Sequence, residues 1–390
     1  MTRVPFARPW MGEPEAAAAR RVILSGWVTQ GPEVAAFERE FAAYVGAPYA
    51  CAVSNCSVAL HLALRVADVG RADEVVTVSH SFIATANAVR YCGAVPVFVD
   101  IEPGTFNINP ALIEAAITPR TRAILVVHQL GMPCDLKQIG AIARRHGIPL
   151  IEDAACAIGS EVLIENRWER IGKPHGDIAC FSFHPRKIMT TGDGGMLTTA
   201  NAEWDKRFRL WRQHSMSVPD TVRHASTQVT FEEYPELGYN YRMTDIQAAV
   251  GRAQLERVPG LITTRRMLAE RYSRLLSERL PSVRVPAEPV WARSNWQSYC
   301  VRLPHGVDQR SVMQALLDQG ISTRRGVMCA HRERAYAIER WRCAGGTNPL
   351  VQSERGTDEG LILPLYAQMT ESEQDEVVLA LVAALPVSRA

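Results

Sequence analysis

Short apolar runs alternate with helix-patterned segments between about residues 30 and 200, and this alternation constrains the fold more than any other feature. Five apolar runs are typical of buried strands: 75–78, 96–100, 123–128, 149–153 and 178–183. Between them, residues 58–67, 83–91, 110–117 and 136–146 carry apolar side chains at helical spacing. The pattern predicts an α/β fold with a mostly parallel sheet sandwiched by helices. Ligands of such sheets bind at the carboxyl ends of the strands.

The remainder of the chain has a different pattern. Residues 244–279 predict a long helix, 283–286 and 299–303 predict strands, and 309–319 and 370–385 predict further helices, the last opening with a capping box. A chain of 390 residues exceeds what one hydrophobic core usually serves. We therefore expect a large domain at residues 1–257 and a smaller C-terminal α+β domain at residues 258–390.

Composition narrows the class of protein. The net charge is +2, from 43 basic and 41 acidic residues, which favours neither a nucleic-acid partner nor a membrane surface. The sequence contains no run of 18 or more apolar residues, so no membrane-spanning helix is expected. The first residues also lack the apolar core of a signal peptide. Nine cysteines include no Cys-x-x-Cys pair. We expect a cytoplasmic enzyme without a metal site.

Three polar residues follow predicted strands and form a candidate catalytic set. Asp153 ends one apolar run, Ser182 lies in the next, and Lys187 comes five residues later. A lone lysine is usually a solvated surface residue, and an aspartate before Ala154 is equally a helix N-cap. Together, however, they supply what a pyridoxal phosphate enzyme needs: a carboxylate at the pyridine nitrogen, a hydroxyl at the phosphate, and an amine for the aldehyde.

Two further segments fit the same cofactor. Cys56 and Ser57 belong to a small polar turn that opens a predicted helix, where free backbone N–H groups and the helix dipole favour an anion. Phe82 follows a strand end, where its ring can stack on a cofactor. The alternatives are an ordinary N-cap at Ser57 and a core position for Phe82.

Taken together, these motifs resemble the DegT/DnrJ/EryC1/StrS family of sugar aminotransferases, which have the fold-type I architecture. The resemblance is carried in order by residues 26–32, 96–101, 152–155, 181–187, 191–195, 237–245 and 363–365.

The resemblance implies a role for each matching residue. Lys187 would bind the cofactor as an imine and move the proton during transamination. Asp153 would pair with the pyridine nitrogen, and Ser182, Cys56 and Ser57 would hold the phosphate. These implied roles agree with the chemistry of the residue types.

Other matching positions complete the implied site. Phe82 would cover one face of the ring. Cys156 stands where His or Gln often supports the phenolic oxygen, and a thiol is a poorer donor. Asn240 matches a residue that the family supplies to the phosphate of the neighbouring subunit, which implies a homodimer with shared active sites.

The resemblance says less about the substrate than about the cofactor. Thr29, His184 and His331 are expected near it, but the Tyr-Pro element that usually precedes the histidine is missing from residues 324–331. The amino donor is expected to be L-glutamate, and the acceptor a keto sugar, most often linked to a nucleotide. The acceptor stays open, because a related branch aminates cyclitols or other keto intermediates of antibiotic pathways.

Three rival functions are disfavoured. A sugar dehydratase of the same family typically has histidine in place of Lys187. A non-catalytic relative has no chemical reason to keep Asp153, Ser182 and Lys187 together. A nicotinamide dehydrogenase is disfavoured because no Gly-x-Gly-x-x-Gly motif follows an early strand.

Overall fold

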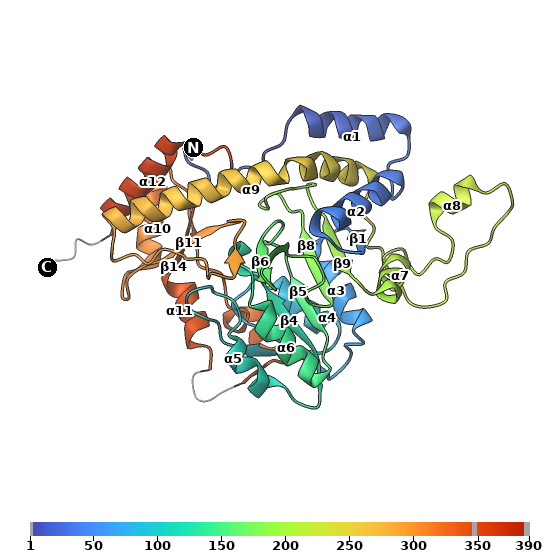
Figure 1. Cartoon of the computed structure of the whole chain (residues 1–390), viewed down its shortest axis with the longest axis horizontal. Helices are drawn as coiled ribbons and strands as arrows, with labels where there is room; N and C mark the ends of the chain where they lie inside the picture. The colour runs from blue at the N-terminus through green and yellow to red at the C-terminus, as the bar shows by residue number, and fades with distance from the viewer. Residues whose placement is uncertain (1–2, 345–348, 386–390) are drawn as a thin grey trace.

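The computed structural model describes residues 3–344 and 349–385. Its central feature is an eight-stranded sheet with the order β1-β9-β8-β5-β4-β2-β3-β13 (Figure 1). The strands are β1 (Tyr49–Val53), β2 (Glu74–Val78), β3 (Val95–Val99), β4 (Thr121–Val127), β5 (Leu150–Asp153), β8 (Ile178–Ser182), β9 (Gly195–Thr199) and β13 (Arg342–Cys343).

Parallel pairing dominates this sheet. The five pairs that link β13, β3, β2, β4, β5 and β8 are parallel, and only β9 runs antiparallel to its neighbours β8 and β1. The five predicted strands are therefore confirmed as β2, β3, β4, β5 and β8, each to within two residues at either end. The register sets Asp153 beside Cys180, and Ser182 beside Gly195, so the ends of β5 and β8 lie together.

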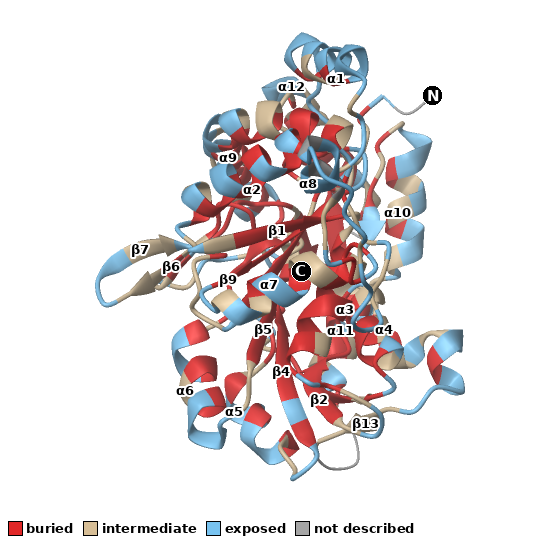
Figure 2. Cartoon of the chain, turned by 90° about the vertical axis from the view of Figure 1, so that its right-hand side faces the viewer, coloured by how far each residue is buried: buried red, intermediate tan, exposed pale blue. Residues whose placement is uncertain are grey.

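Side chains from both faces of the sheet are buried, which explains the continuous apolar runs. In β1, Ala50 and Ala52 join one hydrophobic cluster while Cys51 and Val53 join the cluster on the other face. The first face is covered by α2 (Pro32–Val45), α6 (Leu136–His146) and the start of α9 (Asp245–Arg279), and the second by α3 (Cys56–Val66), α4 (Ala84–Tyr91) and α7 (Ala202–Trp211). Figure 2 shows the buried strands between helices whose outer faces are exposed.

Helix α9 is the longest element, with 35 residues, and lies along the top of the molecule in Figure 1. Its first half packs on the central sheet through Leu255, Val258 and Ile262. Residues from Leu268 onward belong to a second hydrophobic cluster, formed with the C-terminal part of the chain. Pro259 lies inside the helix. The predicted domain boundary after residue 257 falls within this continuous helix and stays a prediction.

The C-terminal part contains a second sheet of three antiparallel strands. Its order is β11 (Tyr299–Arg302), β14 (Gly360–Leu363) and β12 (Arg324–Arg325), and it packs with α10 (Gln309–Asp318) and α12 (Glu371–Ala384). The predicted strand at 283–286 is wrong: only Arg284 forms an isolated bridge, to Arg302. Pro286 lacks the backbone N–H that a longer ladder needs.

The remaining elements are short or peripheral. Helix α1 (Glu13–Ser25) packs along α9, where Glu15 accepts hydrogen bonds from Gln254 and Arg257. The others are α5 (Pro110–Ile113), β6 (Glu161–Ile164), β7 (Arg167–Arg170), α8 (Asp220–Ala225), β10 (Ala292–Arg293), α11 (Val351–Glu359), and the 3-10 turns Glu114–Ala116, Gln129–Gly131, Ala330–Arg332 and Arg334–Ala337. None of the helices in the described part of the chain combines the length and apolarity needed to cross a membrane.

Candidate active site

A cavity of about 460 Å³ opens where the carboxyl ends of the central strands face the small sheet. Asp153 at the end of β5, Ser182 at the end of β8 and Ser57 at the start of α3 line one part of it. Arg324 of β12 and Ile362 of β14 line the opposite part. The cavity thus lies at the edge of the sheet where the sequence pattern predicts a ligand.

Lys187 lies in the loop after β8 and lines this cavity. The loop is fixed by Gln297, which accepts a hydrogen bond from the backbone N–H of Ile188 (3.0 Å) and donates one to the carbonyl of Arg186 (2.6 Å). The Nζ of Lys187 lies 3.1 Å from the Sγ of Cys156. Burial by itself lowers the pKa of Lys187, but the nearby thiols and Asp153 outweigh it, so that the net pKa is raised.

Asp153 is a buried carboxylate, with only 5% of its surface exposed. It accepts hydrogen bonds from the Oγ1 of Thr85 (2.8 Å) and from the backbone N–H of Ala155 (3.1 Å). Thr85 in turn lies 2.8 Å from the Oγ of Ser81. Burial raises the pKa of Asp153, and the bonds from Thr85 and Ala155 partly oppose the rise. Thr85 was not a predicted site residue, although it lies one helical turn after Ser81.

A buried pair supports Asp153 from the opposite face of β5. The Nδ1 of His128 accepts the backbone N–H of Cys134 (3.0 Å), so its Nε2 carries the proton and donates to the Oε2 of Glu152 (2.9 Å). Glu152 also accepts the N–H of Gly176 (2.8 Å), and the side chains of His128 and Glu152 are almost fully buried. The pair fixes the last residues of β5 and thereby the position of Asp153.

The start of α3 presents backbone N–H groups at the edge of the cavity. Asn55 caps the helix by accepting the N–H of Val58 (3.1 Å), and the first-turn N–H groups of Cys56 and Ser57 have no acceptor within a helix. The Sγ of Cys56 lies 3.6 Å from the carbonyl of Cys180, so Cys56 offers its backbone rather than its thiol. A Cβ at Gly195 would lie 2.5 Å from the backbone of Asn55, so β9 reaches this turn only because residue 195 is glycine.

Three more predicted residues line the cavity. Phe82 is 63% exposed, which leaves its ring available to a ligand. Cys156 contacts Lys187, and His184 accepts the backbone N–H of Arg186 (3.2 Å) through its Nδ1. Burial lowers the pKa of His184, and the nearby Arg186 adds to the effect.

The other three predicted residues do not line this cavity. His331 is held between the Oγ of Ser79 (2.7 Å from its Nδ1) and the Oε1 of Glu354 (3.0 Å from its Nε2). Thr29 is exposed near the start of α2. Asn240 is exposed at the base of the segment that carries α8.

The residues of the cavity fit a phosphorylated pyridine aldehyde. An amine, a buried carboxylate, an exposed aromatic face and a helix N-terminus meet in one space of suitable size. Among the described residues, no group of three or more His, Cys, Asp or Glu side chains is arranged to hold a metal ion.

Comparison with known proteins points the same way. The model of the DegT/DnrJ/EryC1/StrS aminotransferase family matches residues 9–382. The aminotransferase TlmJ from Streptoalloteichus hindustanus is 34% identical, with a TM-score of 0.87 over 98% of both chains. DesV from S. venezuelae is 32% identical, with a TM-score of 0.86 over 99% of this chain and 100% of DesV.

A third solved structure bears on the cofactor. The putative sugar aminotransferase Spr1654 from Streptococcus pneumoniae, solved in PLP and PMP forms, is 25% identical to this chain. In its PMP form the TM-score is 0.89 over 98% of this chain and 99% of that one.

Proposed function

Because the chain belongs to the DegT/DnrJ/EryC1/StrS aminotransferase family and is a pyridoxal-phosphate-dependent transaminase, we propose that it moves an amino group from L-glutamate to a nucleotide-linked keto sugar. One observation carries the assignment of the site: the Nζ of Lys187 and the buried carboxylate of Asp153 line the same cavity as the start of α3. Similarity to a putative sugar aminotransferase supports the class of acceptor.

Lys187 is the residue that performs proton transfer in this proposal. When bound, pyridoxal phosphate supplies an aldehyde carbon for the lysine amine and a ring that accepts electrons. The Nζ of Lys187 would hold the cofactor through that carbon and, once the donor amine has displaced it, would carry a proton from the donor's α-carbon to the former aldehyde carbon. The loop held by Gln297 keeps the amine within reach throughout.

The other cavity residues position the ring. Asp153 holds a proton at the pyridine nitrogen, and Thr85 orients its carboxylate through the 2.8 Å hydrogen bond. The N–H groups at the start of α3, together with Ser57 and Ser182, hold the phosphate. Phe82 covers one face, and Cys156 lies on the side of Lys187.

Measurement of the donor half-reaction tests the proposal. With pyridoxal phosphate and L-glutamate, the wild-type protein should produce 2-oxoglutarate in amounts equal to the protein, and a keto-sugar nucleotide should then restore the starting absorption spectrum. Lys187→Ala should lose at least a thousandfold in this rate, because the proton has no other carrier. Lys206→Ala is the matched control, since Lys206 is exposed and pairs with Glu203 on the surface.

Either of two results would contradict the proposal. If the Lys187→Ala variant kept wild-type activity, Lys187 would not be the proton carrier. If the enzyme aminated a cyclitol ketone and no keto-sugar nucleotide, its acceptor would be a cyclitol rather than a sugar nucleotide.

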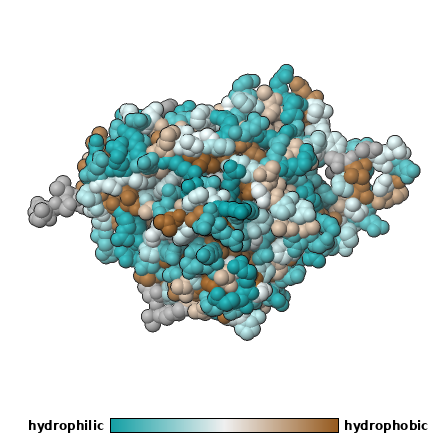
Figure 3. Space-filling model, viewed as in Figure 1, coloured by the Kyte–Doolittle hydropathy of each residue, from teal (hydrophilic) through white to brown (hydrophobic). Residues whose placement is uncertain are grey.

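We extend the proposal to a homodimer with shared active sites. The segment around α8 projects from the body of the chain at the right of Figure 1, and Figure 3 shows hydrophobic surface on it. Its exposed apolar side chains include Val229 and Phe231, each 87% exposed, and Leu237, 82% exposed. Such a surface favours a protein partner, and exposed Asn240 lies at its base.

Mixing two inactive variants tests the shared site. If Asn240 serves the neighbouring subunit, Lys187→Ala and Asn240→Ala should each be impaired. Random mixing then gives hybrids in half of the dimers, with one complete site in each, so activity should return to about a quarter of the wild-type value. Mixing that restores nothing, or a monomer by light scattering, would overturn this part.

A further inference from the structure

The part of the cavity away from the proposed cofactor residues is cationic. Its lining includes the acidic side chains Asp153 and Asp193 and the basic side chains Lys187, Arg186, Arg324 and Arg325. If Asp153 and Lys187 serve the cofactor, the charged side chains that remain in the lining are three arginines and one aspartate, Asp193.

The two arginines of β12 both line the cavity but differ in their partners. Arg325 donates to the Oε1 of Glu333 (3.1 Å), so its charge is already paired. The guanidinium of Arg324 instead lies over the ring of Phe6, 5.5 Å from its centroid, and Phe6 itself lines the cavity. Of the two, Arg324 is the one whose guanidinium is stacked on a ring of the cavity lining.

Arg324 and Arg186 keep their charges available. Within residues 3–344 and 349–385, no acidic side chain forms an ion pair with either of them. Both are exposed, so they lie at the open end of the cavity, whereas Asp153 lies at the buried end. Arg186 and Lys187 line the same cavity, so a ligand that extends from its mouth to its buried end can contact both.

We propose that Arg324 and Arg186 form an anion-binding subsite at the mouth of the cavity, and that it takes the diphosphate of the acceptor substrate. This inference rests on the proposed function. A guanidinium presents a planar set of N–H donors that matches phosphate oxygens two at a time, and stacking on Phe6 orients that plane. A diphosphate fits better than a donor carboxylate, because the carboxylate must stay next to the α-carbon at Lys187, deep in the cavity.

Calorimetric titration of the pyridoxal-phosphate-loaded enzyme with thymidine diphosphate and uridine diphosphate tests the subsite. The wild type should bind a nucleoside diphosphate more tightly than the nucleoside, and Arg324→Gln and Arg186→Gln should each weaken it by about tenfold. Arg324→Lys should recover part of the loss. Arg334→Gln is the control, because Arg334 is exposed and does not line the cavity.

The L-glutamate half-reaction, followed in the same variants, distinguishes the possible failures. An unchanged KM for glutamate supports the subsite. A raised KM for glutamate with unchanged diphosphate binding would assign the arginines to the donor carboxylate and overturn the proposal. Wild-type enzyme that binds no nucleoside diphosphate, yet completes the Lys187-dependent half-reaction, would overturn the subsite while leaving the transaminase assignment intact.

Discussion

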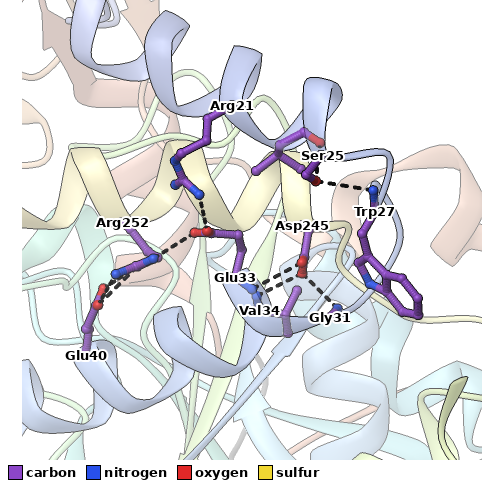
Figure 4. A network of polar contacts seen from close by, with 10 residues as sticks. Arg21, Ser25, Trp27, Gly31, Glu33, Val34, Glu40, Asp245 and Arg252 are labelled. Atoms are coloured by element: carbon purple, nitrogen blue, oxygen red, sulfur yellow. Dashed lines mark hydrogen bonds and ion pairs between the residues drawn. The ribbon is translucent and has the colours of Figure 1, made fainter. Parts of the chain in front are cut away.

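Replacing Asp245 with asparagine should destabilise the protein measurably, because this carboxylate joins two distant parts of the chain (Figure 4). Its Oδ1 accepts the N–H of Gly31 (2.8 Å) and of Val34 (3.0 Å), and its Oδ2 accepts the N–H of Glu33 (3.1 Å). Asp245 therefore caps the start of α2 from the first residue of α9, across more than 210 positions of sequence.

The expected loss in the free energy of unfolding follows from the number of N–H donors that lose their acceptor. Asparagine keeps one oxygen for Gly31 and Val34, but its NH₂ group faces the N–H of Glu33, so one buried donor loses its partner at a cost of about 2 kcal/mol. Loss of the negative charge at the helix N-terminus adds roughly 0.5 kcal/mol. Burial raises the pKa of Asp245 and so opposes the charged form, which offsets part of this loss. We expect a net decrease in the free energy of unfolding of about 2 kcal/mol, and about 4 kcal/mol for Asp245→Ala, where all three donors lose their acceptor.

Urea unfolding at fixed protein and cofactor concentration measures this decrease, provided the denaturant slope is unchanged. Glu40→Gln is the matched control: it breaks the exposed pair with Arg252 in the same region and should cost less than about 1 kcal/mol. Hydrogen exchange of the backbone amides of Gly31, Glu33 and Val34 should also accelerate only in the Asp245 variants. A loss for Asp245→Asn no larger than that for Glu40→Gln, with unchanged exchange, would refute the reasoning.

Three further outcomes are expected. Thr85→Val removes the 2.8 Å hydrogen bond to Asp153, so the carboxylate pKa rises further and the acid limb of the pH–rate profile should move to higher pH; an unmoved limb contradicts the assignment. His128→Phe leaves Glu152 buried without its donor and should lower the free energy of unfolding by about 3 kcal/mol, whereas His128→Gln should cost less. Burial lowers the pKa of His80 to about 4, below its unfolded value near 6.5, so stability is full above pH 6.5 and falls by up to about 3 kcal/mol as the pH drops toward 4; His80→Gln should flatten that part of the profile.

The strands that carry the site were predictable for a physical reason. β2, β3, β4, β5 and β8 are covered on both faces, so nearly every residue is apolar and the runs stand out in the sequence. α1 was not recognised, because its run of four alanines gives a weak apolar stripe. β9 was also missed, because its five residues are Gly195, a methionine, a leucine and two threonines.

At the candidate site, too, some residues were predictable from the sequence and others were not. Lys187, Asp153, Ser182 and Ser57 carry chemistry in their residue types and line one cavity, although their roles stay predictions until tested. The contributions of Thr85, Gln297 and Arg324 depend on contacts with residues 68 to more than 300 positions away, as for the stacking of Arg324 on Phe6. A single sequence contains no signal for such pairings.

Helix α9 has a mechanical consequence for how the cavity opens. Its first half packs on the central sheet, and its second half packs on the hydrophobic cluster that includes the small sheet. The helix therefore connects the two walls of the cavity. Pro259 cannot donate a backbone hydrogen bond, and Gly260 follows it, so resistance to bending is lowest there. Past that point, buried Arg265 donates to the carbonyls of Trp296 and Gln297. Ile262, beyond Pro259, still packs on the central sheet, so a bend at Pro259 would have to loosen that contact before it changed the width of the cavity.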